Sequence, residues 1–211
     1  MNLLKNFVSL SEKLGIISAF ELFNLNEQPS IRSLSRKELD IYSRFMSCKR
    51  RCEFVAGRVA CKKVFFKFTS KETACSEDFS NISVLNNEAG SPFIENSDLS
   101  VSISHSHGIA IASASQHAVG VDIEPISLKR ISALKRMSTE YFSESAQDLT
   151  ALWTLKESLG KALQTGIVEN FSHYETKDFR YENGIYSCKF KNFTFSGIAI
   201  TDGRYSISIV R

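Results

Sequence analysis

The sequence lacks a long apolar run, a strong excess of charge of one sign and a recognisable targeting segment. Its 26 Lys and Arg stand against 23 Asp and Glu, which leaves a net charge of +3. This excess is too small to indicate nucleic acid, whose binders usually carry dense one-sided basic patches, but it is compatible with an acidic partner. Lys5, Glu12 and Lys13 interrupt the N-terminal apolar residues, so the segment matches a signal peptide poorly. With no run of membrane-spanning length, we expect a cytoplasmic protein that binds neither membrane nor nucleic acid.

Cysteine pairs of the CxxC type are also absent. The five cysteines are Cys48, Cys52, Cys61, Cys75 and Cys188. Their odd number and their spacing favour neither a disulfide framework nor a zinc knuckle. We therefore expect free, buried thiols, as is usual in a reducing cytoplasm.

The length and the local patterns predict a mixed fold. With 211 residues, 43% of them hydrophobic, the chain is able to bury a full core in one large or two small domains. Ser35 and Glu38 have the spacing of a capping box, which predicts a helix from there to about residue 46. Residues 49 to 68 are broadly amphipathic and predict a second helix. Turn residues fill positions 86 to 92.

Strand and helix patterns then follow one another to the end of the chain. Strand-like runs cover residues 101 to 105, 109 to 114 and 119 to 124, and helical patterns cover 128 to 137 and 146 to 164. Asn183-Gly184 and Asp202-Gly203 predict hairpin turns in the tail. The order is a crude two-fold repetition with a seam near residue 116, so we expect an N-terminal half, 1 to 116, and a C-terminal half, 117 to 211. The patterns alone predict an α+β fold with antiparallel strands.

The segment VGVDIE, residues 119 to 124, is the most informative part of the chain. In a strand, alternate side chains point to opposite faces, so the valines and the isoleucine would enter a core. Gly120, Asp122 and Glu124 would then share the other face. We expect Gly120 to let a ligand approach closely beside the two carboxylates.

A second motif, WTLKESLGK at residues 153 to 161, predicts a third carboxylate and a cation. Residues four apart are neighbours on a helix, so Trp153, Glu157 and Lys161 would form one ridge. Trp153 is expected to be a core anchor. Lys156 falls in the apolar stripe, and we expect it to bond to a carboxylate or to carbonyl groups. Asp122, Glu124 and Glu157 are oxygen ligands of the kind that Mg²⁺ takes together with substrate phosphates.

These two motifs, in this order, resemble those of the 4'-phosphopantetheinyl transferases, in particular the monomeric Sfp-type branch. ISHS at residues 103 to 106 resembles the serine and histidine that bind phosphate in that family. The resemblance is good over residues 90 to 165 and looser elsewhere. It implies a pseudo-dimer of two similar α+β halves with antiparallel strands and an active site in the cleft between them.

The resemblance also implies an activity and its residues. The 4'-phosphopantetheine arm of coenzyme A would pass to a serine of an apo acyl- or peptidyl-carrier protein, releasing 3',5'-adenosine bisphosphate. Asp122, Glu124 and Glu157 would bind Mg²⁺, and Lys161 would lie beside the pyrophosphate. Glu157 would also act as the base, either directly or through a metal-bound water. The residues implied for coenzyme A are Arg51, Arg58, Ser104, His105 and Lys161. The acidic carrier would dock on the apolar and basic segment 128 to 137, and the enzyme would be a monomer.

Some features of the sequence have a plainer interpretation or depart from the family pattern. His105 and His107 are spaced as a transition-metal half-site on a strand, but no complementary ligands are evident. The basic residues between Lys49 and Lys63 would by default form a solvated helix face. Ser91 stands where the family often has a basic residue. Ala146 stands where it usually has an acid, a few residues after Phe142, so either Glu144 substitutes for that acid or the contact is absent.

Two other classes of function stay open on the sequence alone. One is a catalytically silent module that binds coenzyme A or another phospholigand. The other is a Mg²⁺-dependent phosphohydrolase that uses the same three acids with water as the nucleophile. The sequence does not name the carrier protein or its pathway.

Overall fold

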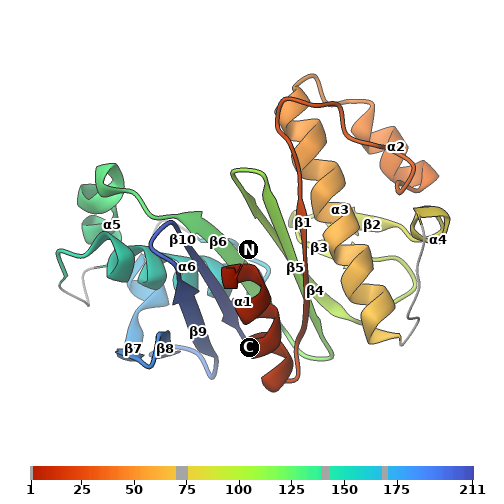
Figure 1. Ribbon diagram of the computed structural model, residues 1–211. Helices are drawn as coiled ribbons and strands as arrows, with labels where there is room; N and C mark the ends of the chain where they lie inside the picture. Colours follow the sequence, from red (N-terminus) through yellow and green to blue (C-terminus); the bar gives the residue numbers. More distant parts are fainter. Residues whose placement is uncertain (1, 70–75, 139–142, 168–170) are drawn as a thin grey trace. The chain divides into compact units, whose positions relative to one another are not determined.

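The computed structural model describes residues 2–69, 76–138, 143–167 and 171–211. The chain divides into two compact units, Val8–His117 and Met1–Phe7 with Ala118–Arg211. Both combine helices with antiparallel sheets (Figure 1), so the predicted α+β class is confirmed. Among the helices of the described parts, none has the length and apolar character needed to cross a membrane.

The unit Val8–His117 is built on one long helix and a three-stranded sheet. The strands β1 (Ile17–Leu22), β5 (Ile109–Ser115) and β4 (Ser100–Ser106) lie in the order β1-β5-β4, with antiparallel neighbours. Helix α3 (Cys48–Phe68) packs along this sheet (Figure 1). Small residues dominate the contact, among them Ala56 and Ala60 of the helix and Ala110, Ala112 and Ala114 of β5. Small side chains let the helix lie close to the sheet.

A short helix and a hairpin complete this unit. The capping box at Ser35 and Glu38 is present and starts α2 (Arg36–Tyr42), as predicted, although the helix ends four residues before the predicted position. The predicted turn at 86 to 92 joins β2 (Val84–Asn86) to β3 (Pro92–Ile94), with Gly90 at a φ of 82°. Helix α4 (Ser76–Ser80) precedes the hairpin.

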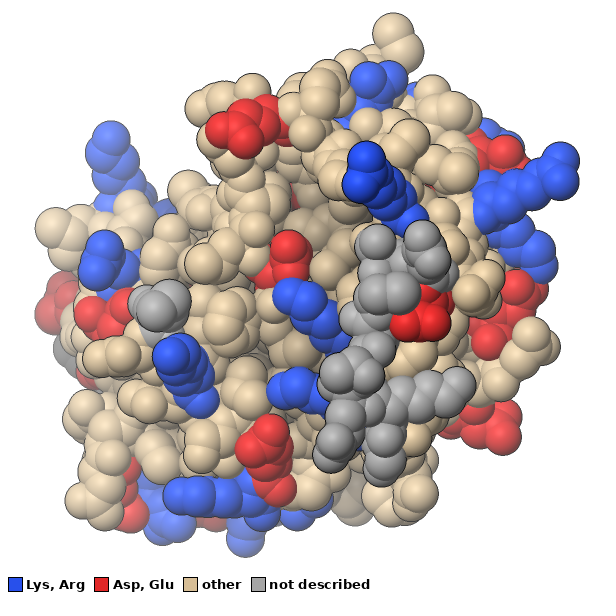
Figure 2. Space-filling model, turned by 45° about the vertical axis from the view of Figure 1, so that its right-hand side comes forward, with Lys and Arg blue, Asp and Glu red and all other residues tan. Residues whose placement is uncertain are grey.

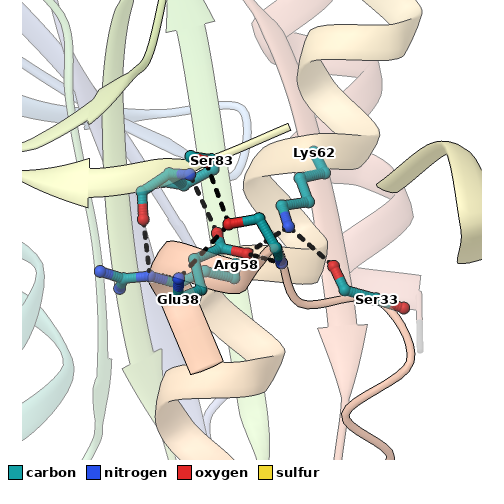
Figure 3. Close-up of polar contacts among 7 residues, drawn as sticks. Ser33, Glu38, Arg58, Lys62 and Ser83 are labelled. Atoms are coloured by element: carbon teal, nitrogen blue, oxygen red, sulfur yellow. Dashed lines mark hydrogen bonds and ion pairs between the residues drawn. The ribbon is translucent and has the colours of Figure 1, made fainter. Parts of the chain in front are cut away.

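A buried ion pair ties α2, α3 and the hairpin together (Figure 3). Glu38 and Lys62 form the pair, and both side chains are fully buried. The Glu38 carboxylate also accepts hydrogen bonds from the backbone N–H groups of Ser35 (2.7 Å) and Val84 (2.9 Å), and Lys62 Nζ donates to Ser33 O at 2.7 Å. The expectation of a solvated basic face on this helix is therefore wrong for Lys62, because its charge is satisfied inside the protein. Arg58 is also buried.

The other unit consists of a five-stranded sheet covered by α6 (Ala146–Ala162). The strands run antiparallel in the order β6 (Gly120–Pro125), β10 (Tyr205–Val210), β9 (Ser196–Thr201), β8 (Ile185–Phe190) and β7 (Thr176–Glu182). A short 3-10 turn, η1 (Leu128–Arg130), leads into α5 (Ile131–Met137), and a second one, η2 (Phe171–Tyr174), precedes β7. The predicted strands and helices of this half are thus confirmed, with ends that differ by a few residues.

The two predicted hairpin turns are confirmed. Asn183 and Gly184 join β7 to β8 with φ values of 52° and 81°, the combination that a two-residue turn requires. Asp202 and Gly203 lie between β9 and β10, where Asp202 Oδ1 accepts hydrogen bonds from the backbone N–H groups of Arg204 and Tyr205, each at 2.9 Å. Both turns fix the register of strands that carry the core.

Two N-terminal elements were not predicted from the sequence. They are α1 (Asn2–Lys13), which buries Leu3, Leu4 and Phe7, and strand β1. On the face shown in Figure 2, Lys and Arg side chains are interspersed with acidic and uncharged ones over the described residues. The four described cysteines are free, as expected, and Cys52, Cys61 and Cys188 are buried. Cys75 lies outside the described residues.

Candidate functional site

Strand β6 presents Asp122 and Glu124 to helix α6. Val119, Val121 and Ile123 are fully buried, as the alternation predicted. The interpretation of Gly120 as an opening for a ligand is wrong, because a Cβ there would lie 1.8 Å from Ser158 O of α6. Gly120 therefore admits the helix backbone and not a ligand. This close approach brings the acids of β6 beside the charged ridge of α6.

Pairs of small hydroxyl side chains hold α6 on the sheet in one register. Thr154 Oγ1 is 3.0 Å from Ser206 Oγ, and Ser158 Oγ is 2.7 Å from Ser208 Oγ. All four residues are buried. Ser206 and Ser208 of β10 pair with Glu124 and Asp122 of β6, so the hydrogen bonds that fix the helix lie next to the acids. These hydrogen bonds therefore also fix the positions of Glu157 and Lys161, which are on the same helix.

Lys161 is bound to Asp122. Its Nζ donates to Asp122 Oδ1 at 2.7 Å and to the backbone O of Val121 at 3.1 Å. The Asp122 side chain is 6% exposed and that of Lys161 is 27% exposed, so the pair is shielded on the acid side and open on the lysine side. A charge-assisted bond of this kind holds both groups in place.

Arg130 is a member of the site that sequence reasoning assigned elsewhere. Its guanidinium donates to Glu124 Oε2 at 2.5 Å. The sequence interpretation placed it only in the docking segment 128 to 137. Its position six residues after Glu124 gives no periodic signal, because the chain leaves the strand and turns into η1 between the two residues.

The three carboxylates, which we call the acid cluster, influence one another. Burial raises the pKa of Glu157 to about 7, and the negative charges of Asp122 and Glu124 add to this effect, while Lys161 and Arg130 oppose it. Burial, followed by the charge of Asp122, also raises the pKa of Glu124, against the effects of Arg130 and Lys161. These shifts indicate negative charge gathered in a poorly solvated place.

The acid cluster fits a hard divalent cation by the chemistry of its donors. All three side chains offer carboxylate oxygens, the ligands that Mg²⁺ takes, and a cation would offset the burial and the repulsion that raise the Glu157 pKa. Across the residues that the structure describes, no three His, Cys, Asp or Glu side chains are grouped as a metal site in their present positions. The metal role of Asp122, Glu124 and Glu157 stays a prediction.

The unit Val8–His117 contains a separate cavity of about 370 Å³, which we call the basic pocket. Its polar lining is formed by Arg50, Glu53, Arg58, Asn86 and His105. Phe45, Phe54 and Pro92 contribute apolar surface. A pocket of this size with an apolar wall and a few convergent polar groups is typical of a small-ligand site.

Arg58 is the best-anchored cation of the basic pocket. Its Nε donates to Val84 O at 3.2 Å, one Nη donates to Asn86 Oδ1 at 2.5 Å, and the guanidinium lies 4.1 Å from the centre of the Phe54 ring. These contacts fix the guanidinium plane against the β2–β3 hairpin. Burial lowers the Arg58 pKa, and the charge of Glu38 opposes this shift.

The other residues predicted to bind coenzyme A are placed differently. His105 lines the pocket, with its Nδ1 3.7 Å from Oε1 of Glu53. Ser104 follows the alternation of β4 to the opposite face and is buried there. Arg51 does not line the pocket, and its Nε donates to Phe45 O at 2.9 Å. Arg50 lines it instead. The roles of all these residues stay predictions.

The structure also tests the predictions made for Trp153, for Lys156 and for the pair His105 and His107. Trp153 is a core residue packed with Leu134 and Leu149, as predicted. Lys156 is buried and donates to Met137 O at 3.0 Å, which confirms a bond to a carbonyl group. His107 has a φ of 45° just after β4 ends, so His105 and His107 do not continue one strand and the transition-metal alternative loses its basis.

The departures from the family pattern are also located. Gly90 and Pro92 line the basic pocket, on either side of Ser91. Glu144 forms an ion pair with Lys135. Phe142 lies outside the described residues, so the segment before α6 is described from Ser143, whose hydroxyl donates to Asp148 Oδ2 at 3.0 Å.

Comparisons with known proteins agree with the resemblance. Residues 118–210 match the model of the 4'-phosphopantetheinyl transferase superfamily, and residues 42–115 match that of the 4'-phosphopantetheinyl transferase N-terminal domain. The holo-[acyl-carrier-protein] synthase of Staphylococcus carnosus (strain TM300) is 40% identical over 63 residues, which are 30% of this chain and 54% of that protein. The holo-[acyl-carrier-protein] synthase of Petrotoga mobilis (strain DSM 10674 / SJ95) is 35% identical over 71 residues, 34% of this chain and 56% of that protein.

The chain therefore spans about half the length of these curated relatives. The two matched regions follow one another along the sequence, and each lies within one structural unit. The two signature motifs of the sequence form the acid cluster within the region that matches the superfamily model. The chain belongs to the 4'-phosphopantetheinyl transferase superfamily.

Proposed function

We propose that the protein is a monomeric, Sfp-type transferase that acts in the cytoplasm. It moves the 4'-phosphopantetheine arm of coenzyme A to a serine of an apo acyl- or peptidyl-carrier protein and releases 3',5'-adenosine bisphosphate. The observation that supports this most is the acid cluster on β6 and α6, with Lys161 bound to Asp122, inside the region matched by the superfamily model. The names of the two relatives support the carrier protein as acceptor.

In this proposal Glu157 receives the proton of the acceptor serine. A general base works best when its pKa is near the working pH, and burial and neighbouring carboxylates raise the pKa of Glu157 to about 7. The serine oxygen would form a bond to the β-phosphorus while the bond from that phosphorus to the bridging oxygen breaks. The electron pair leaves with 3',5'-adenosine bisphosphate, and the serine proton moves to a Glu157 oxygen.

Lys161, and Mg²⁺ held by the carboxylates, would neutralise the negative charge of the pyrophosphate. Mg²⁺, held by Asp122, Glu124 and Glu157, would supply neutralisation of the pyrophosphate oxygens. Lys161 lies at the open side of its pair with Asp122, where its ammonium group is available to a phosphate oxygen as well. Arg130 holds the Glu124 carboxylate in position.

The basic pocket is the proposed place for the 3'-phosphate of coenzyme A. Arg58 offers a guanidinium fixed by two hydrogen bonds and a ring contact, a geometry suited to planar recognition of phosphate. His105 and Arg50 lie on the same lining. Arg51 and Ser104, which the family resemblance also implies, do not line this pocket, so we assign the 3'-phosphate to Arg58, with His105 and Arg50 beside it.

The segment 128 to 137 is the proposed docking surface for an acidic carrier. Leu128 is 79% exposed, and Lys129 beside it is also exposed, so the start of the segment offers an apolar and a basic group to a partner. Leu134, by contrast, is 1% exposed and belongs to the core. The surface is therefore narrower than the sequence suggested and is centred on Leu128 and Lys129.

A carrier-dependent assay separates this proposal from the two alternatives. The protein is incubated with coenzyme A and Mg²⁺, with and without an apo carrier protein, and both products are followed by mass spectrometry. Transfer predicts that the carrier gains one phosphopantetheine arm and that 3',5'-adenosine bisphosphate forms only with carrier. Cleavage of coenzyme A without carrier would indicate a phosphohydrolase, and binding without any product would indicate a silent module. A panel of carriers from fatty-acid, polyketide and peptide synthesis would identify the partner.

A further inference from the structure

Two thiols and a backbone oxygen converge at the start of α3. Cys48 Sγ and Cys52 Sγ are 3.9 Å apart, and the carbonyl oxygen of Glu27 lies 3.9 Å from the first and 3.2 Å from the second. Cys52 is buried, while Cys48 is half-buried and borders solvent. The three donor atoms lie at the corners of a small triangle, which borders solvent on the side of Cys48.

The dimensions of this triangle match those of a tetrahedral metal site. With Zn–S bonds of about 2.3 Å and Zn–O bonds of about 2.1 Å, tetrahedral angles place two sulfurs about 3.8 Å apart and a sulfur and an oxygen about 3.6 Å apart. The three measured separations lie within a few tenths of an ångström of these values. One cation would thus reach all three atoms with little movement.

A disulfide fits the same residues poorly. Cys48 and Cys52 are four residues apart on a helix, a spacing that places Cβ atoms about 5–6 Å apart. A disulfide needs Cβ atoms about 3.5–4.5 Å apart, so the first turn of α3 would have to unwind. Oxidation would cost helix structure, whereas metal binding would not.

Local hydrogen bonds place the Glu27 carbonyl. Asn24 Nδ2 donates to Glu27 Oε1 at 2.6 Å, and Asn26 N donates to Asn24 Oδ1 at 3.0 Å. These bonds shape the turn after β1 so that the Glu27 oxygen faces the thiols. The thiols themselves are brought together by the helical repeat.

We propose that Cys48, Cys52 and the carbonyl oxygen of Glu27 form a binding site for a thiophilic divalent cation of the Zn²⁺ type. On binding, each thiol exchanges its proton for a bond to the metal, two protons pass to solvent, and the metal's charge is unchanged. The fourth position stays open to water or another ligand on the exposed side of Cys48. Soft sulfur donors distinguish this site from the acid cluster, whose hard oxygen donors suit Mg²⁺.

Two consequences follow for the protein. Thiols bind a metal as thiolates, so metal affinity should increase as the pH rises. The bound metal would also fasten the turn at Glu27 to the first turn of α3, the turn that contributes Arg50 to the basic pocket. The existence of this metal site does not depend on whether the protein has the transferase activity proposed above.

Titration with Co²⁺ tests the site directly, because thiolate ligation gives Co²⁺ a sulfur-to-metal charge-transfer absorption that oxygen ligands do not give. The reduced full-length chain is titrated in excess Mg²⁺, which occupies hard oxygen sites. We expect one Co²⁺ per chain with this absorption, and displacement of the band by Zn²⁺. Outer-sphere partners alone account for about 10–100-fold in metal affinity, so loss of either thiol should cost at least that much.

Four single variants complete the experiment. Cys48→Ser and Cys52→Ser should each lose the band, while Cys188→Ser and Cys75→Ser should keep it. Cys48 is half-buried, so Cys48→Ser should fold normally even if Cys52→Ser does not, and circular dichroism checks both. No charge-transfer band in the unmodified protein, a band that persists in Cys48→Ser, or a band lost in Cys75→Ser alone would overturn the proposal.

Discussion

The acid cluster and the basic pocket are built in opposite ways. The acid cluster uses two regular elements, strand β6 and helix α6, and its members repeat with the periods of a strand and a helix. The basic pocket draws on α2 and the residues that follow it, on α3, on the β2–β3 hairpin and on β4, and its lining residues are up to 64 positions apart, from Ile41 to His105. The first site can be recognised from two short sequence motifs, whereas the second forms only after the unit Val8–His117 has folded.

The two sites also stabilise their charges differently. In the acid cluster, Lys161 and Arg130 pair with two of the three carboxylates, and burial together with the accumulated negative charge raises the pKa of Glu157. In the basic pocket, Arg58 is held by carbonyl and amide oxygens. One of these carbonyls belongs to Val84, whose N–H donates to Glu38 of the buried pair. The balance of charges therefore dominates the acid cluster, whereas the basic pocket depends on the buried hydrogen bonds that hold Arg58.

The largest effect is expected from Glu38→Gln, which tests how much the buried pair stabilises the unit that contains the basic pocket. Breaking a buried pair by removing one partner costs about 3–5 kcal/mol, because the other charge stays buried without compensation. The free energy of unfolding in urea should fall by about that amount. The double variant Glu38→Gln/Lys62→Met removes both charges and keeps an amide oxygen for the backbone N–H groups of Ser35 and Val84, so it should recover part of the loss. A Glu38→Gln protein within about 1 kcal/mol of the parent would refute this account.

Asp122→Asn tests whether the acid cluster serves chemistry and not stability. It should lower the transfer rate by about 10²–10³-fold, the usual effect of removing one electrostatic group from an active site, while the unfolding midpoint changes little. Asp178→Asn, at an exposed position of β7 in the same unit, is the matched control and should leave the rate unchanged. Retention of most Mg²⁺-dependent activity in Asp122→Asn would show that the site assignment is wrong.

Glu157 should make the stability of the protein depend on pH. Its pKa is about 7 in the folded protein, against an ordinary value of 4.5, so the folded state keeps a proton that the unfolded chain releases. Between these two values the unfolded state binds fewer protons, and the free energy of unfolding therefore falls as the pH rises from about 4.5 to about 7. Urea unfolding at a series of pH values should show this fall in the parent and a smaller one in Glu157→Gln. Equal slopes in the two proteins would contradict the prediction.

Arg58→Lys tests whether the geometry of the basic pocket matters beyond its charge. Lysine keeps the positive charge but loses the bonds to Val84 O and Asn86 and the planar contact with Phe54. Affinity for 3',5'-adenosine bisphosphate should fall about tenfold, or ~1.4 kcal/mol, in isothermal titration calorimetry. Arg204→Lys, an exposed position, should bind like the parent. Unchanged affinity in Arg58→Lys would place the 3'-phosphate elsewhere.

The smallest effect is expected at the proposed docking surface. Lys129→Glu should raise the carrier KM about two- to fivefold at low salt, with the difference shrinking as salt screens the charge, and should leave coenzyme A binding unchanged. Arg130 is unsuitable for this test because it holds Glu124. Lys189→Glu makes the same change of charge at an exposed position of β8 and serves as the control. If the two variants behave alike, the carrier docks on another surface.

The sequence predicted the elements whose patterns are local. The strand VGVDIE, the helix that carries Glu157 and Lys161, the capping box at Ser35 and the turn at Asn183 and Gly184 each depend on neighbours a few residues apart, and each is present. Helix α1 and strand β1 were missed, although α1 buries three apolar side chains. The free state of the described cysteines also followed from their spacing.

Tertiary structure decided what those residues touch. Gly120 admits the backbone of α6 and not a ligand, and Arg130 binds Glu124 and is not a free docking charge. Lys62 is buried in a pair with Glu38 and is not solvated. Nothing in the local sequence distinguishes these alternatives. The physical reason is that periodicity fixes the face on which a side chain stands but not what packs against that face. The partner is set by contacts across 24 residues for Glu38 and Lys62 and 39 for Asp122 and Lys161, and those contacts form only when the core closes.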